Sequence, residues 1–225
     1  MKISMIRHGR TKGNTIGRYV GGRTDEPLCP EGIALIREQG SFPEVGRVVT
    51  SAMLRARQTA SLLFPNAIQI PREDLNEFDF GTFEGHTHAE LEGDPSYRAW
   101  LDAGAAGTCP SGEPVEELVT RCVRALDEEI LLADREGRSD LVMVLHGGVI
   151  MELMSTCADP ERPFFEWLMK NGACYTAFVD LPLWKKERRF TGWAYHLRYP
   201  AGRAGEESPP EASDDPDGEV PIQER

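Results

Sequence analysis

The sequence predicts an α/β protein: a three-layer α/β/α sandwich around a mostly parallel central sheet. Short apolar segments with strand character alternate with segments of helical periodicity along most of the 225 residues. Such alternation is typical of helices packed on both faces of a parallel sheet. Two separate strand-like segments also end on a histidine followed by a glycine, at the strand ends where open α/β proteins bind their ligands.

Six strands are expected, over 3–6, 47–50, 67–70, 140–145, 175–180 and 193–198. Helices are expected over 33–39, 54–63, 88–101 and 115–130, and from the glycines that follow His146 to about 157. The helix over 115–130 has the clearest pattern, because apolar residues recur along one helical face, and Ser111 is its candidate N-cap. The stretch over 72–112 is rich in glycine, aspartate and proline, so we expect an irregular surface excursion there.

Composition predicts one folded domain over 1–200, because 40% hydrophobic residues in a chain of this length can bury a full core. Residues 201–225 hold eight acidic residues, two basic residues and four prolines, and they carry half of the net charge of −12. We expect this acidic, Pro-rich tail to be flexible. The negative charge of the whole chain argues against a nucleic-acid partner.

The apolar segments are shorter than the roughly 18 residues that a membrane span requires, so no membrane association is expected. The five cysteines are odd in number and form no C-x-x-C pair. This pattern fits free thiols, mostly in the core, of a cytoplasmic protein better than disulfides or a zinc site. The sequence leaves both a monomer and a homodimer open.

The two strand-end histidines are His8, in the segment RHG, and His146, in the segment LHGG. Glycine after each histidine lets the backbone approach a ligand closely, and the helices that follow offer unpaired N–H groups to an anion. The segment SAMLRARQTASLL places Arg55 and Arg57 in the first turn of a helix, where the helix dipole disfavours cations. A bound anion would explain that placement.

These segments resemble the histidine phosphatase superfamily, which includes the cofactor-dependent phosphoglycerate mutases. The resemblance covers most of residues 2–150. It is carried by RHG, Asn14, GGRTDEPLCPEG from Gly21, SAMLRARQTA from Ser51, LNEFDFGTFEG from Leu75, SGEPVEEL from Ser111 and HGG from His146. The resemblance implies a phosphoglycerate mutase-like fold.

The same resemblance implies a role for each matching residue. His8 would be the nucleophile that becomes phosphorylated, and Glu77 would donate a proton to the leaving oxygen. The residues implied in phosphate binding are Arg7, Asn14, Arg55, His146 and Gly147. The catalytic set would comprise His8, Glu77, Arg7, Arg55 and His146. The residues implied at the substrate rim are Arg10, Val20, Gly21 and Thr24.

The chemistry of phosphoryl transfer supports these roles. The phosphoryl oxygens need preorganised positive donors, and the nucleophile must lie in line with the leaving group. Two guanidinium groups near His8 would disfavour its protonation and leave one ring nitrogen free to attack. Glu77 would protonate the departing oxygen and then accept a proton from the water that cleaves phosphohistidine. This chemistry requires no metal and no cofactor, and His86 and His88 lack the third ligand that a zinc site needs.

The segment between Glu77 and His146 contains no lysine and no long insertion with the basic residues that mutases use to hold the rest of their substrate. This favours hydrolysis over mutase activity. The segment GRYVGGRTDEPL and the short excursion are most similar to the α-ribazole-phosphate phosphatases, and related broad-specificity phosphatases share much of this pattern. The expected partner is therefore a small phosphorylated metabolite such as α-ribazole 5′-phosphate. Phosphoglycerate mutase activity, or a non-catalytic phospholigand-binding module on the same fold, are the alternatives.

Four positions depart from the family pattern. Arg10 stands where the family usually has glutamate or glutamine, and it adds positive charge near the expected pocket. Val20 occupies a position where mutases tend to carry a hydroxyl residue. Ala52 and Phe83 replace a common proline and a common tryptophan, which we interpret as tolerable packing changes. None of the four substitutions removes a catalytic group.

Overall fold

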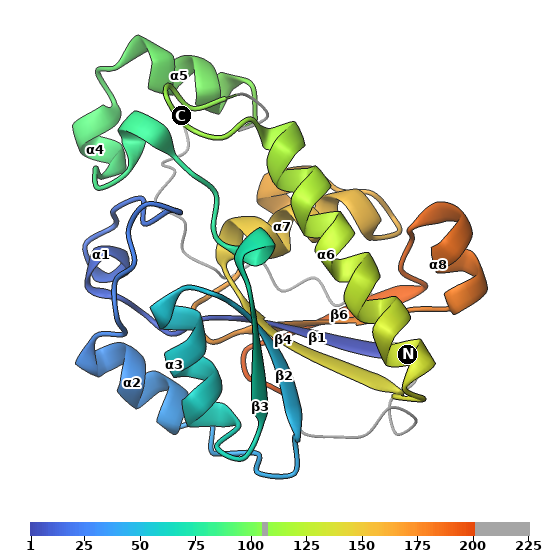
Figure 1. The fold of residues 1–225 in the computed structure, drawn as a ribbon. Helices are drawn as coiled ribbons and strands as arrows, with labels where there is room; N and C mark the ends of the chain where they lie inside the picture. Colours follow the sequence, from blue (N-terminus) through green and yellow to red (C-terminus); the bar gives the residue numbers. More distant parts are fainter. Residues whose placement is uncertain (105–107, 201–225) are drawn as a thin grey trace.

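A computed structural model describes residues 1–104 and 108–200 (Figure 1). The predicted tail over 201–225 lies outside the described residues, so the predicted division at residue 200 stays a prediction. Within the described ranges, no helix is both long enough and apolar enough to cross a membrane.

The described strands form one six-stranded sheet in the order β3-β2-β4-β1-β5-β6. The strands are β1 (Lys2–Arg7), β2 (Arg47–Ser51), β3 (Ile68–Arg72), β4 (Asp140–Leu145), β5 (Cys174–Phe178) and β6 (Gly192–His196). Strands β3, β2, β4 and β1 pair in parallel, whereas β5 runs antiparallel to both β1 and β6. The predicted mostly parallel sheet is confirmed.

Helices cover both faces of the sheet, as the predicted three layers require (Figure 1). Helices α2 (Pro30–Arg37) and α3 (Leu54–Leu63) lie on one face, and α6 (Val115–Arg135) and α7 (Gly147–Cys157) lie on the other. Alternate side chains of a strand point to opposite faces. Accordingly, Met143 of β4 packs in one core with residues of α6 and α7, and its neighbour Val144 packs in a second core with residues of α2 and α3.

The excursion contains two short α-helices where the sequence predicted one over 88–101. Thr87 caps α4 (His88–Leu91), and Asp94 caps α5 (Pro95–Asp102). Pro95 divides them, because proline fits the first turn of a helix but not its interior. Two 3₁₀ turns, η1 (Glu73–Leu75) and η2 (Gly81–Phe83), precede them. Figure 1 shows α4 and α5 projecting from the body of the molecule.

Several predicted boundaries need correction. Ser111 does not cap α6: it has a φ of 59°, and Pro114 is the N-cap residue. Helix α2 begins at Pro30 rather than near 33, since the Cys29 Sγ accepts a hydrogen bond from Gly32 N and forms its cap. The sequence prediction also missed α1 (Lys12–Thr15), η3 (Phe164–Trp167) and α8 (Leu181–Glu187), which are too short to show a helical period.

The cysteines agree with the prediction of free thiols. All five are unpaired, and four of them, namely Cys109, Cys122, Cys157 and Cys174, are buried. Cys29 is partly exposed at the start of α2.

Candidate active site

The two predicted histidines meet because β1 and β4 are neighbours in the sheet. The strands pair in parallel with Arg7 opposite Leu145, so the next residue of each strand is a histidine. His8 N donates to Leu145 O at 3.0 Å, and the two imidazole centroids lie 5.1 Å apart. His8 is 3% exposed and His146 is fully buried. Two histidines 138 positions apart in the sequence therefore share one buried site.

Arg55 lies between these histidines. It follows β2 in the first turn of α3, and its Nε is 3.2 Å from both His8 Nε2 and His146 Nδ1. Its terminal nitrogens donate to the carbonyl oxygens of Thr24, Val20 and Gly21 at 2.8, 3.3 and 3.2 Å. The side chain is fully buried, whereas Arg57 on the same helix is exposed. The guanidinium is therefore fixed by backbone carbonyls and faces both imidazoles.

The hydrogen bonds of His8 determine which nitrogen can attack. Gly9 O lies 2.6 Å from His8 Nδ1, and a carbonyl oxygen only accepts, so Nδ1 carries the proton. Nε2 faces the Nε–H of Arg55 and must keep its lone pair. Burial lowers the pKa of His8 well below its usual 6.5, and the charges of Arg55 and Arg7 lower it further. His8 is therefore a neutral imidazole whose Nε2 carries a lone pair, which accepts from Arg55 Nε.

His146 is also neutral but presents the opposite group. Burial and the charge of Arg55 lower its pKa well below 6.5. Its Nδ1 accepts from Arg55, which leaves the proton on Nε2. That Nε2 is buried and has no hydrogen-bond partner among the described residues. His146 therefore offers an N–H donor beside the predicted nucleophile, His8.

Arg7 supplies a second donor without a partner. Its Nη1 donates to Met169 O at 2.5 Å, but its buried Nε has no partner within the described part of the chain. A Cβ added at Gly147 would lie 3.2 Å from this Nε, so a side chain there would crowd the guanidinium. Buried donors normally have partners. Two unpartnered N–H donors, on Arg7 and His146, suit an anion.

Asn14 presents its amide to the same region. Its Oδ1 accepts from Thr11 N at 3.1 Å and from Asn171 Nδ2 at 3.4 Å. Because the amide oxygen is occupied, the Nδ2 group of Asn14 remains as a donor. Asn171 also donates to His8 O at 3.1 Å. The sequence prediction missed Asn171, because nothing in its local sequence distinguishes it from another loop asparagine.

Glu77 lies in the loop after η1, and its carboxylate reaches the start of α7, two residues after His146. Its carboxylate accepts from Phe78 N at 2.9 Å and from Gly148 N at 3.1 Å, and the residue is 7% exposed. A Cβ added at Gly148 would lie 2.6 Å from Glu77 Oε1, so only glycine permits this approach. The geometry brings one carboxyl group to a site otherwise built from cations and imidazoles.

Comparison with known proteins agrees with this geometry. The family model of the histidine phosphatase superfamily (branch 1) matches residues 3–193. The chain belongs to the histidine phosphatase superfamily. The predicted family, fold class and phosphatase class are therefore confirmed.

Relatives within the superfamily carry several names. An adenosylcobalamin/α-ribazole phosphatase of Salmonella typhimurium is 29% identical, over 80% of this chain and 91% of the relative. A probable phosphoglycerate mutase GpmB of Serratia proteamaculans is 30% identical, over 69% of this chain and 74% of the relative. The crystal structure of TTHB049 from Thermus thermophilus has 30% identity and a TM-score of 0.62, covering 86% of this chain and 98% of that one. The α-ribazole phosphatase structure from Shigella flexneri, at 23% identity, covers 80% of this chain and 92% of that one with a TM-score of 0.67, and shows the fold.

The rim residues of this histidine phosphatase differ in what they contact. Val20, Gly21 and Thr24 touch Arg55 through their carbonyl oxygens, so their backbone holds the guanidinium. Arg10 has an exposed side chain, and its carbonyl oxygen accepts from Cys29 N at 3.0 Å. The backbone of the first three residues belongs to the support of the site, whereas Arg10 remains a candidate for contact with substrate.

The remaining histidines of the excursion lie apart from this site. His86 is 3.8 Å from Glu90, and His88 Nδ1 is 2.8 Å from the Tyr97 hydroxyl. No group of three histidine, cysteine, aspartate or glutamate side chains in the described ranges is arranged to hold a metal ion.

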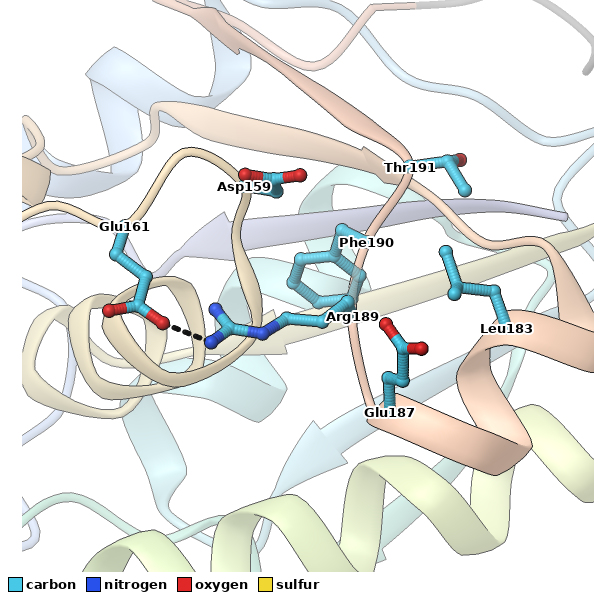
Figure 2. Close-up of a pocket in the computed structure, with 7 residues that line it drawn as sticks. All are labelled: Asp159, Glu161, Leu183, Glu187, Arg189, Phe190 and Thr191. Carbon is cyan, nitrogen blue, oxygen red and sulfur yellow. Dashed lines mark hydrogen bonds and ion pairs between the residues drawn. The ribbon is translucent and has the colours of Figure 1, made fainter.

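A surface pocket of about 560 Å³ lies elsewhere on this phosphatase (Figure 2). Its lining includes Asp159 and Glu161, which follow the last residue of α7, whereas His146 precedes the first. An eleven-residue helix is roughly 16 Å long, which separates the pocket from the histidines. Glu187 and Arg189 also line the pocket, and Arg189 forms an ion pair with Glu161 (Figure 2). Three of the four charged residues that line the pocket are acidic, which does not suit a phosphate anion.

Proposed function

We propose that this chain is a phosphomonoester hydrolase that works through phosphohistidine on His8, without a metal. One observation carries the proposal: His8 Nε2 carries a lone pair that meets the Arg55 Nε–H, in the same buried site as the unpartnered donors of Arg7 and His146. These groups match what phosphoryl transfer demands, a nucleophile surrounded by fixed positive donors. The donors stabilise the charge on the phosphoryl oxygens, so the proposal needs no metal ion.

In the first step, His8 Nε2 attacks phosphorus, and the bond from phosphorus to the ester oxygen breaks. Glu77 gives its proton to that oxygen, which leaves as an alcohol. In the second step, water attacks phosphohistidine while the Glu77 carboxylate accepts a proton from the water. His8 returns to its neutral form with inorganic phosphate as the product, so protons and charge balance over the cycle.

The basic residues between Glu77 and His146 support hydrolysis over mutase activity. A mutase must hold the rest of its substrate while the phosphoryl group moves. Arg98 is exposed on α5, and its Nε donates to Glu92 O at 2.6 Å. Arg121 on α6 is engaged with Glu113 and with backbone carbonyls. Arg121 is therefore engaged, and Arg98 alone would offer a second anionic group one arginine where mutases use a lysine and paired arginines.

We infer that the substrate is a small phosphorylated metabolite and that α-ribazole 5′-phosphate is the first to test. The relatives named adenosylcobalamin/α-ribazole phosphatase support this choice, since the alignment with the Salmonella protein spans most of both chains. Free thiols support a reducing compartment such as the cytoplasm. The net charge of −12 supports the absence of a nucleic-acid partner. A monomer and a homodimer both remain compatible with the proposal.

A phosphometabolite panel in EDTA tests the proposal. It should include α-ribazole 5′-phosphate, 3-phosphoglycerate with and without 2,3-bisphosphoglycerate, and simple sugar phosphates. We expect phosphate release from wild type, none from His8→Ala, and an acid-labile phosphoenzyme when Glu77→Gln slows turnover. Transfer between positions of phosphoglycerate without phosphate release would favour the mutase. Retained ligand binding with no turnover from pH 5 to 8 would favour the binding module.

A further inference from the structure

The loop that carries Glu77 is held from outside the site. Glu77 follows η1 in an irregular segment, so no regular ladder of hydrogen bonds fixes its backbone. The carbonyl oxygens of Asp74, Asn76 and Glu77 instead accept from one side chain, the guanidinium of Arg121 on α6, at 3.0, 2.7 and 3.3 Å. A residue 44 positions away thus fixes the backbone of the proposed proton donor.

Arg121 uses its full set of donors in this arrangement. Its Nε and Nη2 donate to the two carboxylate oxygens of Glu113 at 2.6 and 2.8 Å, and Nη1 and Nη2 donate to the three carbonyls. A guanidinium has five N–H groups in a rigid fork, and five acceptors surround this one. The Arg121 and Glu113 side chains are 19% and 15% exposed, which limits competition from water. A lysine could not reproduce this geometry, because it has three donors on one nitrogen.

We propose that Arg121 is a positioning residue for proton transfer: it holds the Glu77 carboxyl where the leaving oxygen departs. Fixing the carbonyls of residues 74, 76 and 77 sets the direction of the Glu77 side chain, which then meets Gly148 N at 3.1 Å. Arg121 acts through Glu77 and does not touch the phosphoryl group. The inference rests on the proposed function, in which Glu77 donates the proton.

Leaving-group dependence separates positioning from a general structural effect. Nitrophenolate leaves without help from an acid, whereas an alkoxide requires protonation. For Arg121→Met we expect kcat on an alkyl phosphate to fall about 100-fold, the range in which general acids act and in which a displacement of about 1 Å is felt. Glu77 also assists the second step for every ester, so p-nitrophenyl phosphate is followed by nitrophenolate release in the first turnover, which reports the attack of His8 alone. That first-turnover rate should change by less than about threefold, and its half-maximal substrate concentration should stay constant, since phosphate binding is untouched.

Two further variants on α6 and one double variant with Glu77→Gln make the test more specific. Arg124→Met is the matched control, because Arg124 is 62% exposed on α6 and meets the loop at the Asp74 carboxylate, at 3.8 Å, whereas Arg121 holds the carbonyls; it should show no leaving-group dependence. Arg121→Lys keeps the charge but loses the fork, so we expect the same selective loss, about tenfold or more on the alkyl phosphate. It also serves as the test variant if Arg121→Met does not fold. Adding Arg121→Met to Glu77→Gln should cost nothing more on the alkyl phosphate, because Arg121 acts through Glu77.

The outcomes distinguish this inference from the proposed function. If Glu77→Gln shows no selective loss on the alkyl phosphate, the assignment of Glu77 as proton donor fails. If Glu77→Gln shows that loss but the Arg121 variants slow the first turnover of both substrates equally, or of neither, the positioning role of Arg121 is overturned. Full alkyl phosphate turnover by Arg121→Lys would show that one positive charge suffices and would also overturn it.

Discussion

Gly148→Ala should impair proton transfer without weakening the fold. Gly148 is the second residue of α7, and its N–H donates to Glu77 Oε2 at 3.1 Å. An added Cβ would lie 2.6 Å from Glu77 Oε1, against an ordinary contact of at least 3.4 Å. The carboxylate must therefore move by about 0.8 Å. A misplacement of about 1 Å in a catalytic group can cost roughly 100-fold in rate, so we expect a loss of that order on alkyl phosphates.

The stability of the same variant is expected to move little. Alanine is favoured over glycine inside a helix by about 1 kcal/mol, which offsets part of the contact strain. We therefore expect a melting temperature within about 4 °C of wild type. The variant should therefore lose activity while its melting temperature stays nearly constant. That result would exclude general unfolding as the cause of the lost activity.

The assay compares initial rates on an alkyl phosphate and on p-nitrophenyl phosphate, with thermal melts on the same samples. Gly46→Ala is the control, because a Cβ there would meet nothing within 4 Å. We expect that variant to match wild type on both substrates. If Gly148→Ala turns over the alkyl phosphate as fast as wild type does, the close contact between Gly148 and the Glu77 carboxylate does not position Glu77, and the reasoning is refuted.

Three further predictions concern the charged and titratable groups. Because the pKa of His8 is lowered, phosphohistidine should still form well below pH 6.5. Single-turnover rates against pH measure this. Arg55→Gln removes a positive charge beside the ring, so it should raise the pKa of His8 and move the acid-side loss to higher pH. Because the folded pKa of His8 and of His146 lies below the unfolded value near 6.5, their contribution to stability is complete above about pH 6.5 and is lost as pH falls below it. Wild type should therefore lose more unfolding free energy between pH 7 and 5 in urea than His146→Gln does, and equal losses would contradict this linkage. Glu129, 3% exposed, accepts from two arginines, so Glu129→Ala should lower the free energy of unfolding by about 3 kcal/mol in urea titrations, whereas Glu128→Ala, on the half-exposed neighbour, should cost under about 1 kcal/mol.

Much of the site could be predicted because its residues lie in short segments with distinctive chemistry. His8 and His146 each end a buried strand, and Arg55 begins a helix where the dipole disfavours a cation. Each position is unusual within a window of a few residues. The family resemblance then added Glu77 and Asn14, whose local sequence alone does not require a role.

The supporting residues could not be predicted in the same way. Asn171 reaches Asn14 across 157 positions, and Arg121 reaches the backbone of the Glu77 loop from a helix face. In the sequence, Arg121 is one of many charged residues on an amphipathic helix, and solvent is the usual environment of such a residue. Only the packing of α6 against η1 shows that its five donors are buried among carbonyls and a carboxylate.

The same distinction holds for the fold. The long helix α6 and the buried strand β4 have strong periodic patterns, and the predicted strand over 140–145 matches the observed one. The break between α4 and α5 depends on one proline and two capping side chains, which outweigh the helical pattern of the surrounding segment. Short elements such as α8 are stabilised by tertiary contacts, including the hydrogen bond of 2.9 Å from Trp184 Nε1 to Asp127.

An acidic chain can hold a phosphate because electrostatic forces at contact distance exceed those of the distant net charge. A guanidinium about 4 Å from a phosphate oxygen, at an effective dielectric near 20, contributes about 4 kcal/mol per unit charge. Charges about 20 Å away act through water and are screened within about 8 Å at physiological salt. Burial lowers the pKa of Arg55, and the carboxylates of Glu77, Asp25 and Glu84 act on it at closer range in the opposite direction. They keep this guanidinium charged in a buried position, so the nearby acids support anion binding at the site more than they oppose it.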